Sequence, residues 1–304
     1  MAIKMKNPGI YQALIAQLDK TARHNRQGSF RTKERYYEAM QRFCRFLEDE
    51  YHLQKLANVS GKHLTAYVIY MQAEGKSAST VKTDLAAIRF FHDKLERAKY
   101  RLPSNDDLSV ELECRRFGQV DRTWSEREFN LFLDACARDG HDDFAAVVCL
   151  TWHAGLRIHE CFRIDTAMAE QALREDAITV KGKGGKVRTV PINESIREVL
   201  KKFLDVTPRG HKLFVPDDTP THSAIAQLQM YIYKVRPAIQ DDGSTRPMTH
   251  HGLRHSYAAR TWQELIGSGM SQLNASLRVS QLLGHERPDV TNVYLASVKG
   301  GSSC

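Results

Sequence analysis

Apolar side chains recur at spacings of three and four residues along most of the first hundred positions, which is the period of an amphipathic α-helix. One such stripe runs through Thr32–Tyr51. A second helix is predicted from about Gly61 to Ala73, with Ser60 as its N-cap and Gly75 as its stop. A third starts near Ser79. These short helices predict a small all-helical domain.

The helical period fails between Tyr100 and Thr123 and resumes at Ser125, where Ser125-x-x-Glu128 has the form of a helix capping box. We interpret the intervening stretch as a linker between domains. The leading segment is expected to add a short helix at Leu14–Leu18. The predicted division of the chain is an N-terminal extension (1–28), a helical domain (29–100), a linker (101–122) and a second domain (123–304).

β-Branched residues cluster in two short runs, Ala177–Val180 and Lys186–Val190, on either side of a glycine-rich turn. Such a pattern predicts a β-hairpin. Helical spacing then returns around Ile196–Phe203 and Ala224–Val235, and three more helices are predicted toward the C-terminus. The expected fold class is mainly α, with an all-helical N-terminal domain followed by an α+β domain that contains a small antiparallel sheet.

The composition is that of a soluble globular protein, with 304 residues of which 42% are hydrophobic and 26% charged. No apolar run approaches the ~18 residues of a membrane span, and the N-terminus lacks the apolar stretch of a signal peptide. We therefore expect a cytoplasmic protein with no membrane partner. The six cysteines are scattered without a Cys-x-x-Cys pair, so we expect reduced thiols in the core.

The net charge of +8 is placed unevenly along the chain. Residues 1–118 carry 21 Lys or Arg against 14 Asp or Glu, a net charge of +7, whereas residues 119–304 carry 23 against 22, a net charge of +1. An excess confined to one region indicates a surface for a polyanion. A merely solvated basic face is the alternative, and charge alone leaves both open.

Four segments carry residue types that are suited to catalysis. They are Ala154–Glu160, with the sequence Ala-Gly-Leu-Arg-Ile-His-Glu; the glycine-rich turn Lys181–Lys186; His251–His255, with the sequence His-Gly-Leu-Arg-His; and Leu283–His285, followed nine residues later by Tyr294. Each is weak alone, because an arginine at a helix start or a lysine in a glycine turn is usually a solvated surface residue. Their combination, and their order along the chain, are more informative about function than any one of them.

Together these segments resemble the tyrosine recombinase and integrase family, whose pattern is an arginine, a lysine in a β-hairpin, His-x-x-Arg, a histidine and a tyrosine. The matching residues in this sequence are Arg157, Lys183, His251, Arg254, His285 and Tyr294. The resemblance covers nearly the whole chain, because the basic helical region 29–100 looks like the family's core-binding domain, which is of the SAM-like type. It implies that residues 123–304 form the catalytic domain.

The reaction implied by the resemblance is transfer of a DNA phosphodiester to a tyrosine, with negative charge spread over the non-bridging phosphate oxygens. Arg157 and Arg254 each offer a planar, permanently charged fork for these oxygens. His251 lies three residues before Arg254, so one helical face would present both toward one phosphate. A free phenol has a pKa near ~10, so Tyr294 needs a base or nearby cations to attack at neutral pH.

The resemblance also assigns the proton transfers. His251 assists proton transfer from Tyr294, and His285 donates a hydrogen bond to a non-bridging oxygen. Glu160 matches an acidic position of the family, and we expect it to orient an arginine rather than to react. His255 is likewise expected to support its neighbours.

A lysine in the glycine turn is expected to protonate the departing 5′-hydroxyl. Lys183 takes the family's position, and Lys181 and Lys186 are its rivals because the hairpin can slip by a few residues. No cofactor is expected, because the arginines supply the charge stabilisation that a metal ion gives in many nucleases. His251 and His255 lie four apart, but no nearby Cys or carboxylate completes a familiar zinc spacing. No ATP-binding glycine-rich P-loop motif is present.

The resemblance implies double-stranded DNA as the substrate and a covalent 3′-phosphotyrosine intermediate. It further implies four protomers that exchange strands on two DNA sites, accessory DNA-bending or directionality factors as further partners, and a nucleoid-associated location. Two alternatives are a type IB topoisomerase, which uses a similar constellation as a monomer, and a DNA-binding protein that does not cut. The glycine-rich hairpin and the small helical domain favour the recombinase.

The ends of the chain add two expectations. Ten residues follow Tyr294, so a contact between protomers through the C-terminal tail is expected to be short or reorganised. Residues 1–28 are too few for an additional DNA-binding domain ahead of the helical one, which favours a simple two-domain recombinase.

Overall fold

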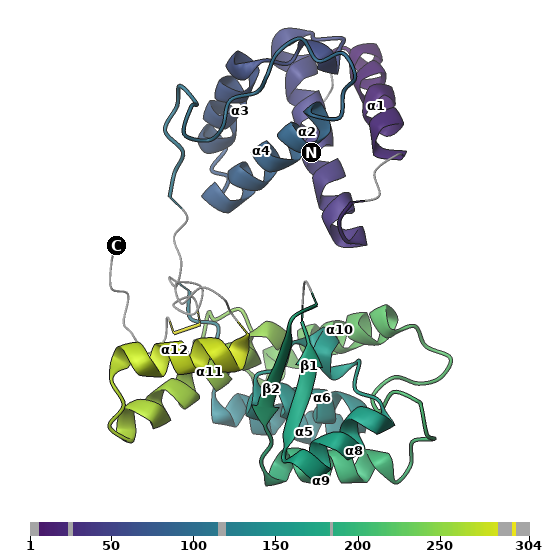
Figure 1. Cartoon of the computed structure of the whole chain (residues 1–304), viewed down its shortest axis with the longest axis vertical. Helices are drawn as coiled ribbons and strands as arrows, with labels where there is room; N and C mark the ends of the chain where they lie inside the picture. Colours follow the sequence, from purple (N-terminus) through teal and green to yellow (C-terminus); the bar gives the residue numbers. More distant parts are fainter. Residues whose placement is uncertain (1–5, 24–26, 115–119, 183–184, 285–293, 296–304) are drawn as a thin grey trace. The chain divides into compact units, whose positions relative to one another are not determined.

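The computed structural model describes residues 6–23, 27–114, 120–182, 185–284 and 294–295. The chain forms two compact units, one within residues 1–116 and one within residues 117–304. Figure 1 shows the helices and strands of the two units, and each unit has its own hydrophobic core. We describe them separately.

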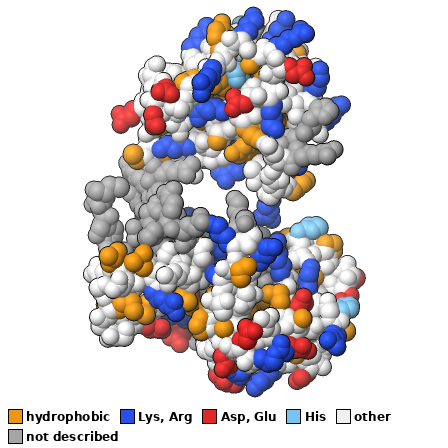
Figure 2. All heavy atoms as spheres, in the orientation of Figure 1, with side chains coloured by type: hydrophobic (Ala, Val, Ile, Leu, Met, Phe, Trp, Pro, Cys, Tyr) orange, Lys and Arg blue, Asp and Glu red, His pale blue; other side chains and the backbone are white. Residues whose placement is uncertain are grey.

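The first unit is all-helical in its described residues. Its elements are α1 (Pro8–Arg23), α2 (Phe30–Tyr51), the 3₁₀ turn η1 (Leu56–Asn58), α3 (Gly61–Ala73) and α4 (Ala78–His92). The predicted cap Ser60 is confirmed, since it forms a capping box with His63, whose ring accepts from the Ser60 backbone N–H at 3.0 Å. Lys and Arg side chains are spread over the visible face of this unit, with a few acidic side chains between them (Figure 2).

The structure differs from the sequence-based division at both edges of this unit. Leu14 and Leu18 of α1 are fully buried in its core, because their spacing of four forms one apolar stripe on a helix much longer than the predicted segment. At the other edge Leu102 is buried, and Arg89 donates to the Pro103 carbonyl at 2.7 Å. These contacts group residues 8–23 and 101–103 with the helical unit, whereas the sequence assigned them to an extension and a linker.

The second unit combines helices with one small sheet. Its elements are α5 (Glu126–Asp139), α6 (Asp142–Ala154), α7 (Ile158–Cys161), α8 (Thr166–Glu175), β1 (Ala177–Lys181), β2 (Val187–Pro191), α9 (Glu194–Leu204), α10 (Thr221–Ile239), α11 (His250–Gly267) and α12 (Gln272–Leu283). The central α6 is buried along most of its length and packs against α5, α9 and α11. A helix that is apolar on most sides is buried in this way. The third helix predicted toward the C-terminus falls outside the described residues.

The predicted β-hairpin is confirmed. β1 and β2 pair antiparallel, with Thr179 opposite Thr189 and Lys181 opposite Val187. Alternation buries Ile178 and Val180 of β1 on the face that joins the core. The expected fold class, a mainly helical chain with an α+β second domain and a small antiparallel sheet, is therefore confirmed.

The cysteines that the structure describes are free thiols. Cys44, Cys136, Cys149 and Cys161 are buried, as expected, whereas Cys114 is exposed. Burial raises the pKa of the Cys161 thiol to about 12, so this group stays protonated at neutral pH. Among the described helices, none has the length and apolar character needed to cross a bilayer.

Candidate active site

Arg157 is placed by a sharp turn between α6 and α7. Gly155 ends α6 in the left-handed region, with φ +60°, and a Cβ at this position would overlap the Tyr257 ring. Arg157 then precedes α7, and its backbone N–H donates to Glu160 at 2.7 Å. Its side chain donates to the same carboxylate at 3.0 Å and stays 26% exposed. The turn therefore leaves Arg157 anchored but accessible.

Replacing Gly155 with alanine is expected to lower the free energy of unfolding by about 2–5 kcal/mol. Left-handed backbone costs an L-residue ~1–2 kcal/mol, and the overlap with Tyr257 adds a packing cost of ~1–3 kcal/mol. Gly140→Ala is the matched control, since Gly140 has φ +74° and open space around its Cβ position. Urea titration of both variants measures the difference. Equal losses would show that the close packing on Tyr257 contributes nothing.

Glu160 is a buried carboxylate that pairs with two arginines, Arg157 and Arg188. Its side chain is inaccessible to solvent, and Arg188 of β2 donates to both carboxylate oxygens, at 2.7 Å and 2.6 Å. Burial opposes ionisation of Glu160, but the hydrogen bonds and charges of Arg188 and Arg157 outweigh it and lower its pKa to about 2. Glu160 therefore keeps its negative charge at neutral pH and holds both arginines.

Arg254 is almost completely buried on α11, with 1% of the residue exposed. Its guanidinium donates to the backbone carbonyls of Gly155 and Leu283, which end α6 and α12. Burial lowers its pKa to about 10, so the side chain is still positively charged at neutral pH. Its charge lies 5.6 Å from the centre of the Tyr294 ring, and the two side chains share a hydrogen bond.

Tyr294 lies among three of the predicted site residues. Its ring stacks on His255 with centroids 4.4 Å apart and meets His251 edge-on at 5.4 Å. The two histidine rings are 5.1 Å apart. Only 8% of Tyr294 is exposed. The segment after α12 therefore brings its tyrosine onto the face of α11 that carries the His-x-x-Arg motif.

His251, one of the two histidines that contact Tyr294, is neutral at physiological pH. Burial, together with the charges of Arg254, Arg122 and Arg157, lowers the pKa of His251 to about 4. A neutral imidazole can accept a proton. The neighbouring His250 points elsewhere and shares a hydrogen bond of 3.1 Å with Thr151 in the core, as expected for an ordinary structural residue.

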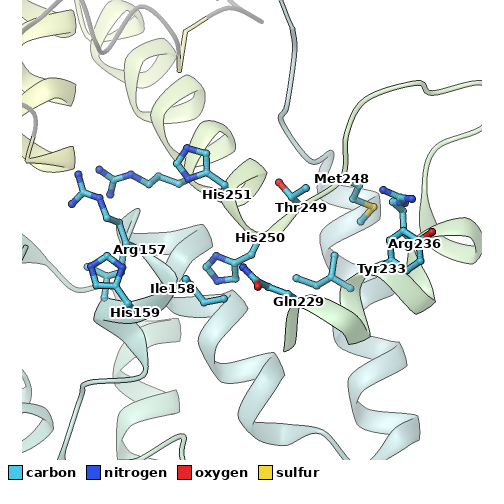
Figure 3. Close-up of a pocket in the computed structure, with 13 residues that line it drawn as sticks. Arg157, Ile158, His159, Gln229, Tyr233, Arg236, Met248, Thr249, His250 and His251 are labelled. Atoms are coloured by element: carbon cyan, nitrogen blue, oxygen red, sulfur yellow. The ribbon is translucent and has the colours of Figure 1, made fainter. Parts of the chain in front are cut away.

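A pocket of about 410 Å³ opens beside these residues. Arg157, His251 and Arg254 line it, together with Tyr233 and Arg236 of α10. Figure 3 shows Arg157 and His251 at one end of the pocket and Tyr233 and Arg236 at the other. Positive charge and hydrogen-bond donors thus converge on a space large enough for a phosphodiester.

Two predicted residues, Lys183 and His285, lie outside the described residues. Their neighbours reach the site, however. A Cβ on Gly182, at the end of the hairpin strand, would lie 3.6 Å from Glu160 and 3.8 Å from Arg157. Gly284 ends α12 immediately before His285, with φ +66°. The structure therefore brings together Arg157, His251, Arg254 and Tyr294, with Glu160 and His255 in contact with them.

Sequence reasoning missed Arg188. It shares the inward face of β2 with the buried Val190, and its side chain is only 9% exposed. The strand alternation contained the signal, because a charged residue on a core-facing position needs an opposite charge nearby. Glu160, in a segment already singled out, is that charge. Within the described residues, no three His, Cys, Asp or Glu side chains are grouped so that they could hold a metal ion.

Arg157, Arg254 and the neutral His251 line a pocket large enough for a phosphodiester, and Tyr294 lies against His251 and Arg254. Such a set of residues is the constellation of an enzyme that transfers a phosphoryl group to tyrosine. The model of the phage integrase family matches residues 123–300, and that of the phage integrase N-terminal SAM-like domain matches residues 15–99. The chain therefore belongs to the phage integrase family, the tyrosine recombinases, whose function is site-specific DNA recombination.

Known relatives agree with this assignment. The tyrosine recombinase XerD of Halalkalibacterium halodurans is 23% identical over 273 residues, which cover 86% of each chain. The tyrosine recombinase XerC of Brucella suis is 26% identical and covers 80% of this chain and 75% of its own.

Solved structures show the same fold. A lambda integrase dimer bound to a COC′ core site matches with a TM-score of 0.65 and 16% identity, covering 96% of this chain and 79% of that one. The Tn1549 transposon integrase in complex with a circular intermediate DNA matches with a TM-score of 0.60 and 16% identity, covering 94% of both chains.

Proposed function

We propose that this recombinase cleaves DNA with Tyr294 as its nucleophile. The phenolic oxygen attacks the scissile phosphorus, a bond to the DNA 3′-phosphate forms, and the bond to the 5′ oxygen breaks. The observation that carries the proposal is the contact of Tyr294 with His251, His255 and Arg254, far from it in the sequence. The energy of the broken bond is kept in the phosphotyrosine, so rejoining needs no high-energy cofactor.

The surrounding side chains have complementary roles in this step. Arg157 is the exposed member of the arginine pair and lines the pocket, so it is suited to donate to the non-bridging phosphate oxygens. Arg254 places its positive charge 5.6 Å from the centre of the Tyr294 ring, where negative charge develops during the attack. His251 accepts the phenolic proton as a neutral base.

Lys183 and His285 complete the proposal on the strength of their sequence positions alone. Lys183 protonates the departing 5′ oxygen, and His285 donates to the phosphate. Gly182 and Gly284, which precede them, both approach the Arg157–Glu160–Arg188 network, and this supports the assignment.

The substrate we infer is double-stranded DNA, bound in large part through its phosphates. The charge of +7 on residues 1–118 supports this, as do solved relatives in complex with DNA. Recombination between two duplexes requires cleavage of four strands, and each protomer supplies one Tyr294. A homo-tetramer on two DNA sites follows from that count. Accessory DNA-bending or directionality factors stay a prediction.

The test is covalent trapping on DNA that carries the junctions of the protein's own element, with a nick placed so that the cleaved fragment diffuses away. Denaturing gels resolve the adduct, and mass spectrometry maps the modified peptide. An adduct on Tyr294 supports the proposal, and sequencing the trapped DNA identifies the site. Tight, salt-sensitive binding to these junctions without an adduct would contradict it.

The pH dependence of cleavage is expected to follow the lowered pKa of His251. A base must be deprotonated to act, so activity is present above its pKa and is lost as the pH falls through about 4. The apparent second-order rate constant of adduct formation, which reports the free protein, is therefore expected to stay flat from pH 7 to near 5. A loss of activity already between pH 7 and 6 would contradict this assignment.

A further inference from the structure

Arg188 is a buried arginine that does not line the pocket but is paired with Glu160, the carboxylate that also holds Arg157. Its side chain is 9% exposed, whereas that of Arg157 is 26% exposed. A side chain of this kind on the inward face of a strand is normally apolar, and a buried charge is costly without a full set of partners. Arg188 has partners on all three nitrogens, and these partners indicate its role.

Each of the three nitrogens of the Arg188 guanidinium donates a hydrogen bond. Its two terminal nitrogens donate to the two oxygens of Glu160 at 2.7 Å and 2.6 Å. Its Nε donates to the backbone carbonyl of Leu282 at 3.0 Å. One side chain thereby ties three segments together, namely strand β2, the turn that carries Arg157, and the last turn of α12.

The first consequence concerns Arg157. Because Arg188 occupies both oxygens of Glu160 in a bidentate pair, the side chain of Arg157 shares only one of these oxygens, through one nitrogen at 3.0 Å. The other side-chain nitrogens of Arg157 are not bound to Glu160, and the side chain lines the pocket. If Arg188 were removed, the buried carboxylate would lose its main partner and attract the Arg157 guanidinium into a full fork, away from a bound phosphate.

The second consequence concerns the end of α12. Its last two carbonyls are held by two buried arginines, Leu282 by Arg188 and Leu283 by Arg254. Positive side chains at this position also complement the negative end of the helix dipole. Gly284 follows in left-handed conformation, where a Cβ would lie 2.9 Å from Arg188. The point at which the chain leaves α12 is therefore fixed against Arg188, just before His285 and ten residues before Tyr294.

We propose that Arg188 is a positioning residue for DNA cleavage, which keeps Arg157 turned toward the scissile phosphate and fixes the end of α12 beside it. This inference rests on the proposed function, because it assumes that Arg157 and Tyr294 act on a phosphodiester. It predicts a loss of reaction rate without a matching loss of DNA affinity.

The experiment compares Arg188→Met, which keeps the length and apolar stem, with Arg188→Lys, which keeps the charge but not the fork. The rate constant of adduct formation is measured at saturating protein on the nicked substrate, and Kd is measured separately by gel shift. We expect Arg188→Met to react ~100-fold more slowly, as misplacement of catalytic groups by about 1 Å does. Kd is expected to stay within about threefold, because Arg188 contributes no phosphate contact. Arg188→Lys should fall between Arg188→Met and wild type.

A double variant separates positioning from a general loss of structure. In Glu160→Gln/Arg188→Met the buried negative charge is gone, so nothing withdraws Arg157 from the pocket. We expect this double variant to react about tenfold faster than Arg188→Met alone, a coupling of the kind shown by groups in contact. A purely structural role for Arg188 would make the second substitution an additional loss.

Arg197→Met is the matched control. Arg197 also belongs to this unit, is 25% exposed and forms ion pairs with two acidic residues, Asp176 and Glu194, but neither acid pairs with a residue that lines the pocket. Its replacement is expected to leave the cleavage rate within about twofold. Circular dichroism and thermal melting of all variants check that they are folded, and Arg188→Lys replaces Arg188→Met in the comparison if the latter is unfolded.

Three results would overturn the inference: a wild-type cleavage rate in Arg188→Met, a loss confined to Kd, or a double variant slower than the single one. A failure of the proposed function gives a different result. In that case the wild-type protein itself forms no adduct on Tyr294, and the inference is overturned together with its premise.

Discussion

Replacing Tyr294 with phenylalanine is expected to lower the rate of DNA cleavage by at least ~10⁴-fold, because the variant has no oxygen to attack phosphorus. The fold should be preserved. The ring packs on His255 and beside Arg254 through its faces and edge, and phenylalanine keeps these contacts. Gel shift on the intact site should give a Kd within a few-fold of wild type, while the nicked substrate yields no adduct in denaturing gels.

The matched control for this prediction is Tyr231→Phe. Tyr231 is 6% exposed, close to the 8% of Tyr294, and its hydroxyl donates to Asp139 at 2.9 Å. Loss of that hydrogen bond costs ~1 kcal/mol of stability but removes no group from the pocket. Cleavage by Tyr231→Phe should therefore be near wild type. A covalent adduct in Tyr294→Phe would place the nucleophile at another residue and refute the assignment.

Local sequence patterns predicted the elements of this fold that depend on local chemistry. The N-cap at Ser60, the capping box at Ser125 and the hairpin around Gly182–Gly185 depend on residues within a few positions of each other, and the described parts match the prediction. The packing of α1 was missed, because the short apolar stripe through Leu14 and Leu18 is recognisable as core only when the other helices that it contacts are known.

In the candidate site, too, the sequence predicted the contacts between near neighbours but not those between distant segments. His251 and His255 lie four apart on a helix, so their proximity follows from helical geometry. Their stacking with Tyr294 depends on how the chain returns after α12, which no local pattern encodes. We expected Tyr294 near these histidines only because the order and spacing of the motifs resemble those of the family.

The burial of Arg254 could not be predicted from the sequence pattern. The sequence predicted two equivalent phosphate forks, yet the structure shows Arg254 buried and bound to two helix ends, while Arg157 remains partly exposed. Burial is a tertiary property, so the two arginines could not be distinguished in advance. The distinction matters for experiment, because substitution of Arg254 removes hydrogen bonds inside the core as well as charge from the site.

Arg157 is consequently the better residue for measuring transition-state stabilisation. Arg157→Ala is expected to slow adduct formation at saturating protein by ~10²- to 10³-fold, or about 3–4 kcal/mol, the usual cost of removing a preorganised donor from a developing oxyanion. Glu160 retains its bidentate pair with Arg188, so the carboxylate stays compensated and the fold should survive. Arg163→Ala, an exposed arginine six residues further along, is the control and should react at the wild-type rate.

The decisive comparison for Arg157 uses a substrate in which a methyl group replaces one non-bridging oxygen of the scissile phosphate. This change removes the negative charge that the arginine is proposed to stabilise. If Arg157 acts on that charge, the difference in rate between wild type and Arg157→Ala must shrink on the methylated substrate, because there is less charge left to stabilise. An unchanged rate difference, or an effect of Arg157→Ala confined to Kd, would make Arg157 an ordinary phosphate contact and transfer the electrostatic role to Arg254.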